Sequence, residues 1–411
     1  MNDKKKGQKK RLQSYFASCP LRLEDFLETE LKTQSVSDIQ KVHGGVKFKC
    51  DELSVLKVLH FTRIASRIFK LLDVYPINNQ DDLYSKVKNK WWHKVFDLDQ
   101  TFKITTLLDP DAAKIFKNSL HLSRVIKDGM VDQYRDEKGE RPNVDTNNPD
   151  LPFLARIEGR GKKDGFNALI YLDICGKPLS DRGYRQPGHA APLRENLAAA
   201  MVYQTNWDKH ENFFDPMCGT GTIIIEACAI KMGLPPSYLK ILKAVDSIEK
   251  PYAYQKQNWY KENNDIINPH QKWLVEQADE IETKLGKKPN NIFASDIRID
   301  KIKKSLQAAK LNYCIQLAKA DATEIDTFGD SGIVICNPPY GERLGTEEET
   351  KELYYQFGQN IKHNFGGHKV FVLSLQKGPI GNIHLKTKAK TPFLNGQLDC
   401  RLFEYEINPK K

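Results

Sequence analysis

Long apolar runs are absent from this sequence of 411 residues. No segment approaches the roughly 20 apolar residues that a membrane-spanning helix needs. The basic start, MNDKKKGQKKR, is not followed by the apolar segment that an export signal requires. The composition therefore argues against an inserted or exported protein, and we expect a cytoplasmic one.

Metal-binding cysteine patterns are missing as well. The eight cysteines are scattered, without a CxxC pair or a Cys/His cluster at zinc spacing. We therefore expect reduced cysteines in the core and no bound metal. A GxxxxGKS or GxxxxGKT segment is also absent, which argues against a loop that binds NTP phosphates. The cysteines are Cys19, Cys50, Cys175, Cys218, Cys228, Cys314, Cys336 and Cys400.

Positive charge is in excess, with a formal net charge of +10. Such an excess suits a polyanionic partner, because lysine and arginine side chains that neutralise phosphates release condensed counterions. A solvated basic surface is the plain alternative. Residues 1–12 concentrate lysines and are predicted to form a basic N-terminal arm.

The order of predicted elements divides the chain into three folding units behind this arm. Residues 13–70 are predicted to form a small α+β module, and residues 71–160 continue with further short strands and helices. Residues 161–411 alternate apolar strands with helices, which predicts an α/β domain with a parallel sheet covered on both faces. Residues 232–290 interrupt this alternation with a polar helical insertion, which we expect to cap the edge of the sheet.

A glycine loop, DPMCGTGT at residues 215–222, lies between an apolar strand and an apolar helix. Gly219 and Gly221 permit a tight turn and the close approach of a ligand at the carboxyl end of a strand. Nucleotide-like ligands bind at that end of such sheets. A bare GxG motif is a weak signal, so the loop alone does not identify the ligand.

Two acidic residues, Asp296 and Asp321, follow later strands. A carboxylate at the end of the second strand can accept hydrogen bonds from ribose hydroxyls, and one at the third from an adenine amino group. Each alone is more typical of a helix cap, but together, after successive strands, they favour a cofactor site. The gap from Asp215 to Asp296 far exceeds the roughly 20 residues of a dinucleotide fingerprint, so the insertion must loop out of the sheet.

The most specific motif is the tetrapeptide Asn337-Pro338-Pro339-Tyr340, which directly follows the apolar strand GIVIC. The two prolines fix φ and remove backbone donors, which stiffens the turn and directs carbonyl oxygens into the cleft. The Asn337 side-chain oxygen and the Pro338 carbonyl can then accept both hydrogens of a planar amino group. Tyr340 can stack on a base that has swung into the pocket. An ordinary turn with an exposed tyrosine is the alternative.

Cysteine catalysis is a competing mechanism, because a thiolate can add to a pyrimidine ring before methylation at carbon. Cys336 ends the strand before the tetrapeptide, and Cys218 lies in the glycine loop. Both are better explained as small buried residues.

With these residues identified, the sequence resembles the THUMP-domain class I methyltransferases, of the 23S rRNA guanine-N2 type with a single methyltransferase domain. DPMCGTGT resembles the cofactor loop of that family, and NPPYGERLG its catalytic loop. The resemblance covers essentially the whole chain. It also includes the flanking segments YFASCPLRLEDFLETEL, VDTNNPDL, SDRGYRQPGHAAPLRENLAAAM and NGQLDCRLFEYEI.

The resemblance implies a ferredoxin-like module at 13–70, a THUMP RNA-binding domain at 71–160 and a Rossmann-like class I methyltransferase domain at 161–411. It also implies roles for particular residues. S-adenosylmethionine would be held by Asp215, Pro216, Cys218, Gly219, Thr220, Gly221, Asp296, Asp321 and Ala322, with Pro192, Arg194 and Glu195 lining the same site. Asn337, Pro338, Pro339 and Tyr340 would carry the transfer, and Arg182, Tyr184 and Arg185 would contact RNA.

The function expected from these features is metal-free methyl transfer from S-adenosylmethionine to the exocyclic N2 of a guanine in 23S rRNA or its large-subunit precursor. A tRNA guanine, or an adenine N6 in DNA or RNA, is an alternative substrate. From a different class, the chain could be an RNA-binding ribosome assembly factor without activity. Because the sequence ends at Lys411, a second methyltransferase domain is not expected.

Overall fold

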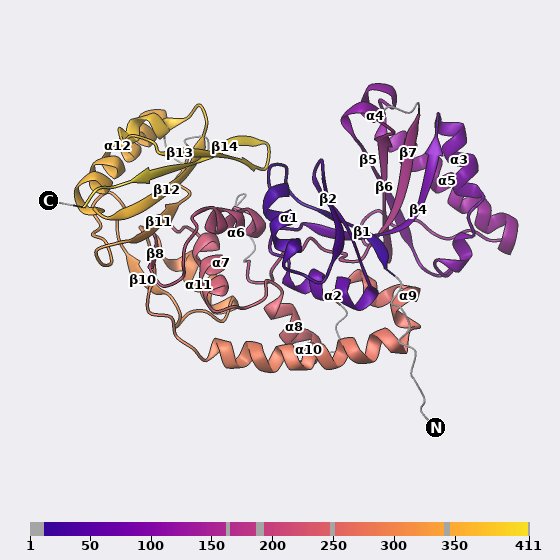
Figure 1. The fold of residues 1–411 in the computed structure, drawn as a ribbon, viewed down its shortest axis with the longest axis horizontal. Helices are drawn as coiled ribbons and strands as arrows, with labels where there is room; N and C mark the ends of the chain where they lie inside the picture. The colour runs from indigo at the N-terminus through magenta and orange to yellow at the C-terminus, as the bar shows by residue number, and fades with distance from the viewer. Residues whose placement is uncertain (1–11, 162–164, 186–192, 247–250, 341–345, 410–411) are drawn as a thin grey trace.

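The computed structural model describes residues 12–161, 165–185, 193–246, 251–340 and 346–409 (Figure 1). Two seven-stranded sheets organise these residues, one from the first half of the chain and one from the second. Figure 1 shows the first sheet from the centre to the right and the second on the left, with the long helix α10 along the bottom of the picture below α8 and α2. Within the described ranges, no helix is both long and apolar enough to cross a membrane.

The first 65 or so described residues fold as a βαββαβ module, in which each helix covers the same face of the sheet. Tyr15 and Ala17 of β1 point into the core shared with the helices, while Phe16 points to the opposite face and stacks on Phe69. This alternation is the period of two expected of a strand that is buried on both faces. The elements are β1 (Gln13–Ser18), α1 (Glu24–Lys32), β2 (Ser37–Val42), β3 (Gly45–Cys50), α2 (Glu52–Phe61) and β4 (Arg67–Ile77).

The long strand β4 joins this module to the next, because it pairs with β1 through its first half and with β7 along most of its length. The sheet therefore continues without interruption, in the order β2-β3-β1-β4-β7-β6-β5. Helices α3 and α5 pack together beside the second half of the sheet. The added elements are α3 (Gln80–Lys88), η1 (Trp92–Lys94), β5 (Phe102–Leu108), α4 (Pro110–Ile115), α5 (Ser119–Lys138), β6 (Leu151–Gly159) and β7 (Phe166–Asp173).

Strand β7 lies on the N-terminal side of the domain division. It pairs antiparallel with both β6 and β4. The boundary expected between residues 160 and 161 falls between the two strands of the β6–β7 hairpin, whereas the structure keeps both strands in the first sheet. A strand belongs to the sheet whose strands supply its hydrogen-bonding partners. The sequence of β7 alone does not show which strands those are.

The second sheet has the order β10-β9-β8-β11-β12-β14-β13, with five parallel strands followed by an antiparallel hairpin. All five residues of β11 are buried, as expected for a central strand of a parallel sheet with helices on both faces. Its strands are β8 (Asn212–Asp215), β9 (Ile292–Asp296), β10 (Gln316–Lys319), β11 (Gly332–Cys336), β12 (His368–Leu375), β13 (Ala389–Asn395) and β14 (Leu398–Glu406). Its helical elements are α6 (Glu195–Gln204), α7 (Thr222–Lys231), α11 (Asp300–Ala308), α12 (Glu347–Asn364) and η3 (Pro379–Ile383).

The insertion between α7 and β9 is helical, as predicted, but it does not cap the sheet edge. Its longest helix, α10, contacts α8, α9 and α2, so it joins the ferredoxin-like module to the second domain (Figure 1). Trp273 of α10 packs against His60 and Phe61 of α2. The elements of the insertion are α8 (Tyr238–Asp246), η2 (Ala253–Lys256), α9 (Asn258–Lys261) and α10 (Asn264–Leu285).

The contact between α2 of the first domain and α10 of the insertion is called the domain seam below. Two buried histidines, His60 of α2 and His270 of α10, lie there with ring centroids 5.8 Å apart. The Ser237 hydroxyl donates to the His60 carbonyl at 2.9 Å, so the His60 Nδ1, 3.0 Å from the same oxygen, must donate to it. The Nε2 atoms of both rings are buried without a hydrogen-bond partner in the described part of the chain. Burial lowers the pKa of both rings, that of His270 to about 4.

The seam is therefore expected to weaken in acid. A folded-state pKa below the usual 6.5 means that the stabilising contribution is present above pH 6.5 and is lost as the pH falls toward 4. For His270 the loss amounts to about 3 kcal/mol in the free energy of unfolding. Urea unfolding at several pH values should show a smaller acid loss for His270→Phe than for the wild type. The exposed His363 supplies the control substitution, His363→Phe, and equal acid losses in all three proteins would contradict the assignment.

Candidate active site

The candidate site lies where the carboxyl ends of β8, β9, β10 and β11 meet at one edge of the second sheet. Strand order reverses between β8 and β11, which is the switch point where open α/β sheets bind ligands. Asp215 ends β8, Asp296 ends β9, Asp321 follows β10 and Asn337 follows β11. The pairing of these neighbouring parallel strands places the four residues in one row along that edge.

The glycine loop adopts a left-handed turn at both of its glycines, with φ of 55° at Gly219 and 84° at Gly221. Gly221 is the N-cap of α7, and a Cβ there would lie 2.8 Å from Cγ1 of Ile302. A Cβ on Gly219 would meet nothing within 4 Å. Gly221 is thus required by protein packing, while Gly219 faces open space into which a ligand can fit.

Backbone bonds tie this loop to the neighbouring strand. The Cys218 amide donates to the Ser295 carbonyl at 3.0 Å, and the Gly219 amide donates to the Asp296 carboxylate at 2.8 Å. The Ser295 hydroxyl donates in turn to the Pro216 carbonyl at 3.3 Å. The loop after β8 and the end of β9 therefore form one rigid unit.

The three carboxylates of the row differ in exposure. Asp215 is buried and accepts the Met217 amide at 3.1 Å, so it supports the loop from beneath. Burial, with a contribution from Asp296, raises the pKa of Asp215 well above its usual value. Asp296 is half-buried, and the exposed Asp321 accepts the backbone and side chain of Thr323 at 2.9 and 2.7 Å. Asp296 and Asp321 are therefore the carboxylates that can reach a ligand.

The remaining predicted residues of the loops have supporting positions. Thr220 is half-buried, with its hydroxyl 3.3 Å from that of Thr222. Ala322 is buried, and its carbonyl accepts the Asn360 side-chain amide at 2.8 Å.

The tetrapeptide after β11 has an internal hydrogen bond that the sequence did not predict: the Tyr340 hydroxyl donates to Oδ1 of Asn337. Pro338 is buried, while Asn337, Pro339 and Tyr340 are half-buried. Desolvation raises the pKa of Tyr340, so its hydroxyl stays a donor at neutral pH. The rest of the resembling segment, residues 341–345, lies outside the described residues.

The two cysteines nearest the site are unsuited to nucleophilic catalysis. Cys218 and Cys336 are both buried, and desolvation raises the pKa of each thiol above its usual value. A thiol that stays protonated is a poor nucleophile. This geometry disfavours the cysteine mechanism that the sequence left open.

The expectation that Arg182 and Tyr184 contact RNA is wrong, because these side chains are only 2% and 3% exposed. The Arg182 Nε donates to Glu226 Oε1 at 3.2 Å, and the Tyr184 hydroxyl lies 3.5 Å from the same oxygen. Arg63 of the first domain contacts the other carboxylate oxygen of Glu226 at 3.3 Å. These residues hold α7, the helix after the glycine loop, against the ferredoxin-like module.

Sequence reasoning missed Glu226 and Arg63 altogether. A signal was present, because Glu226 is the only charged residue within the apolar run TIIIEACAI. A carboxylate in a fully buried helix requires a cationic partner.

The residues predicted around α6 differ in exposure and in their partners. Arg185 forms a two-point pair with Glu195, at 3.0 Å through Nε and 2.8 Å through a terminal nitrogen. Arg185 is partly exposed, Glu195 is buried, and Arg194 is the exposed N-cap residue of α6. Pro192 lies outside the described residues.

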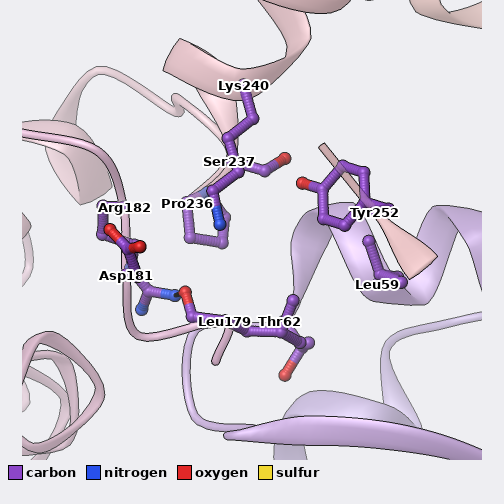
Figure 2. Close-up of a pocket in the computed structure, with 9 residues that line it drawn as sticks. All are labelled: Leu59, Thr62, Leu179, Asp181, Arg182, Pro236, Ser237, Lys240 and Tyr252. Atoms are coloured by element: carbon purple, nitrogen blue, oxygen red, sulfur yellow. Dashed lines mark hydrogen bonds between the residues drawn. The ribbon is translucent and has the colours of Figure 1, made fainter. Parts of the chain in front are cut away.

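Arg182 also lines a small cavity, and Figure 2 shows the polar and apolar side chains around it. Its volume is about 10 Å³, enough for about one water molecule. It belongs to the domain seam and not to the loops after β8 and β11, so it is not a substrate pocket. Its lining residues are Leu59, Thr62, Leu179, Asp181, Arg182, Pro236, Ser237, Lys240 and Tyr252.

Comparison with known families accounts for this arrangement. The RMKL-like methyltransferase domain matches residues 182–404, more than half of the chain. The chain belongs to this family. A THUMP domain matches residues 78–161, and the RlmL ferredoxin-like domain matches residues 14–69. The predicted combination of ferredoxin-like, THUMP and class I methyltransferase domains is confirmed, and S-adenosylmethionine is the methyl donor of the family.

Individual relatives support the family assignment. The ribosomal RNA large subunit methyltransferase K/L of Buchnera aphidicola subsp. Acyrthosiphon pisum (strain APS) is 34% identical over 395 residues. The aligned region covers 94% of this chain and 53% of that protein. The chain thus spans about half the length of the curated relatives it matches.

Solved structures show the same fold over nearly the whole chain. SMU.472, crystallised with SAH, has a TM-score of 0.77 at 23% identity, covering 98% of this chain and 100% of that one. A predicted N6-adenine-specific DNA methylase from Listeria monocytogenes str. 4b F2365 also has a TM-score of 0.77 at 23% identity, covering 97% of both chains.

Proposed function

We propose that this protein transfers a methyl group from S-adenosylmethionine to the exocyclic N2 of a guanine in 23S rRNA, in the cytoplasm. The observation that carries the proposal is the position of Asn337 and Pro338 directly after β11, next to the glycine loop after β8. The Asn337 side-chain oxygen and the Pro338 carbonyl thus lie beside the loops after β8, β9 and β10, which form the proposed cofactor edge of the sheet. The names of the curated relatives, ribosomal RNA large subunit methyltransferase K/L, support rRNA as the substrate.

The residues of this edge fit the proposed cofactor. The exposed Asp321 and half-buried Asp296 carboxylates can accept hydrogen bonds from adenosine hydroxyl and amino groups. The open space at Gly219 lets a ligand approach the loop backbone closely. SMU.472, which has the same fold, was crystallised with SAH, and this supports the placement.

When bound, the cofactor supplies an electrophilic methyl group on a sulfonium. The Asn337 Oδ1 and the Pro338 carbonyl would accept the two hydrogens of the target amine and so orient the nitrogen toward that methyl group. On transfer the nitrogen would gain the methyl group and then lose one proton to water, and the cofactor would leave without its methyl group. A carboxamide oxygen has two acceptor positions, so Tyr340 can keep its bond to Asn337 while the amine occupies the second. The Tyr340 ring is then available to stack on the extruded base.

A pair of glycine substitutions separates protein packing from cofactor binding. Gly221→Ala is expected to destabilise the fold by about 1–3 kcal/mol, because the residue is left-handed and its Cβ meets Ile302. Gly219→Ala is expected to cost about 1–2 kcal/mol in stability, from its left-handed backbone without a steric clash, yet to weaken cofactor binding by roughly 10-fold through blocked approach. Thermal unfolding and calorimetric titration with S-adenosylmethionine measure the two effects. Unchanged cofactor affinity in Gly219→Ala would place the cofactor elsewhere.

Related substrates define the alternatives. A tRNA guanine requires the same amine chemistry, and an adenine N6 presents a similar planar amino group. The name of the Listeria structure points to the adenine of DNA, whereas the ferredoxin-like and THUMP domains favour RNA. An inactive RNA-binding assembly factor is the third alternative, against which the retained Gly219, Gly221, Asn337 and Tyr340 weigh.

One labelling experiment distinguishes these outcomes. The full chain is supplied with radiolabelled S-adenosylmethionine and with RNA from cells that lack the gene, and the RNA is digested to nucleosides. Label in N2-methylguanosine from 23S rRNA is the expected result. Label in tRNA or in N6-methyladenosine would show that the protein is a methyltransferase with a substrate other than the proposed one. RNA binding without label would favour the assembly factor.

A further inference from the structure

The turn between α3 and β5 carries two consecutive tryptophans with opposite environments. Trp92 is fully buried, and its Nε1 donates to the Val87 carbonyl at 2.7 Å. Trp91 is 56% exposed, whereas the other tryptophans of the chain are buried or half-buried. Trp92 therefore explains how the turn is anchored, and Trp91 is not needed for the core.

Trp91 belongs to a small cluster of groups that suits a nucleotide. Its ring and that of His93 are nearly parallel, at an interplanar angle of 23° with centroids 5.9 Å apart. The Lys94 ammonium lies 3.8 Å from the centroid of the Trp91 ring. An isolated exposed apolar residue needs no explanation. An exposed ring, a half-buried ring and a cation together are the elements of single-strand recognition.

The charge of Lys94 is available to a ligand. Its neighbours Lys88 and Lys90 form ion pairs with Asp136 and Asp73. Among the residues that the structure describes, Lys94 has no acidic partner and contacts only the face of Trp91. Because a lysine stem is flexible, the ammonium can move from the ring to a phosphate when a base takes its place.

Hydrogen bonds from the Gln133 side chain fix the position of the cluster. The Gln133 side chain of α5 is buried and accepts the Trp92 amide at 3.0 Å. The same side chain lies 3.1 Å from the His93 Nδ1, so its amide group donates to that nitrogen. The His93 ring is thereby held in one orientation, with its proton on Nε2. A fixed platform loses little conformational entropy when it binds a ligand.

We propose that Trp91, His93 and Lys94 form a binding site for an unpaired base of the RNA substrate and the phosphate next to it. The proposal rests on the proposed function, since it requires an RNA substrate. The site would supply RNA contacts from the THUMP domain, whereas the buried Arg182 and Tyr184 cannot supply the RNA contacts expected of them. The excess of positive charge in the chain favours RNA over a protein partner.

The test compares RNA binding by the full chain and its variants, with a single-stranded oligoadenylate and 23S rRNA as probes. Trp91→Ala is expected to weaken binding of both probes by roughly 5- to 150-fold, the range for loss of one base-stacking contact. Trp91→Phe keeps an aromatic ring and is expected to restore most of the affinity. Lys94→Gln should reduce the slope of log affinity against log salt by about one, a change that Trp91→Ala should not produce.

A matched control is available in the methyltransferase domain. Tyr313 is 77% exposed and also has a lysine near its ring, with the Lys288 ammonium 5.5 Å from the centroid. Tyr313→Ala is expected to bind both probes as the wild type does. Wild-type affinity in Trp91→Ala, or equal losses in Trp91→Ala and Tyr313→Ala, would overturn the site.

Methylation by the wild-type protein separates this test from the proposed function. If the wild type labels N2-methylguanosine and Trp91→Ala binds RNA normally, only the stacking site is refuted. If the wild type binds RNA without labelling it, the proposed reaction fails, while the effect of Trp91→Ala on binding still decides the site. Unchanged thermal unfolding of Trp91→Ala confirms that the buried Trp92 still anchors the turn.

Discussion

Asn337→Ala is expected to reduce methyl transfer by at least about 100-fold while leaving the affinity for S-adenosylmethionine nearly unchanged. The side-chain oxygen of Asn337 is one of the two proposed acceptors for the target amine, and misplacing a reacting group by about 1 Å costs on this scale. The cofactor edge is built from the loops after β8, β9 and β10, which this substitution does not touch. Single-turnover methylation and calorimetric cofactor titration measure the two quantities separately.

Two further variants make this test specific. Tyr340→Phe removes the hydroxyl that donates to Asn337 but keeps the ring, so most activity should remain, whereas Tyr340→Ala should lose it. Asn290→Ala is the matched control, since Asn290 is exposed and precedes β9 at the opposite edge of the same sheet. Normal turnover in Asn337→Ala would refute the proposed role of the tetrapeptide.

Glu226→Ala is expected to lower the free energy of unfolding by about 3–5 kcal/mol, a large part of the roughly 5–15 kcal/mol typical of a folded protein. The substitution leaves the buried Arg63 and Arg182 guanidinium groups without their shared carboxylate. An uncompensated buried charge is far more costly than the loss of a surface ion pair. Chemical denaturation of the full chain measures the effect.

The control for this prediction is Glu276→Ala on α10. Glu276 is exposed, and its oxygen lies 3.9 Å from the Lys272 ammonium, so its loss should change the free energy of unfolding by at most about 0.5 kcal/mol. Glu226→Gln keeps the shape of the side chain but removes its charge, and it should also destabilise the protein. Wild-type stability in both Glu226 variants would contradict this prediction, because it would show that groups other than Glu226 balance the charges of the two arginines.

The sequence by itself determined the order of domains and the loops of the candidate site. An alternation of apolar strands and helices is a local pattern, and the strands of a parallel sheet present their carboxyl ends at one edge. Gly219 and Gly221 mark the turn after β8 because left-handed backbone favours glycine. Asn337 was found because it directly follows an apolar strand, and Asp296 because it lies at the end of one.

Only the tertiary structure decided which polar residues are free and which hold the domains together. The local sequence around Arg182, in a basic turn, is the same whether this side chain contacts RNA or Glu226, which lies 44 positions further along the chain. The assignment of β7 to the first sheet and the contact of α10 with α2 likewise depend on partners far away in sequence. Burial and pairing are properties of such distant contacts, and no local pattern of residues contains them.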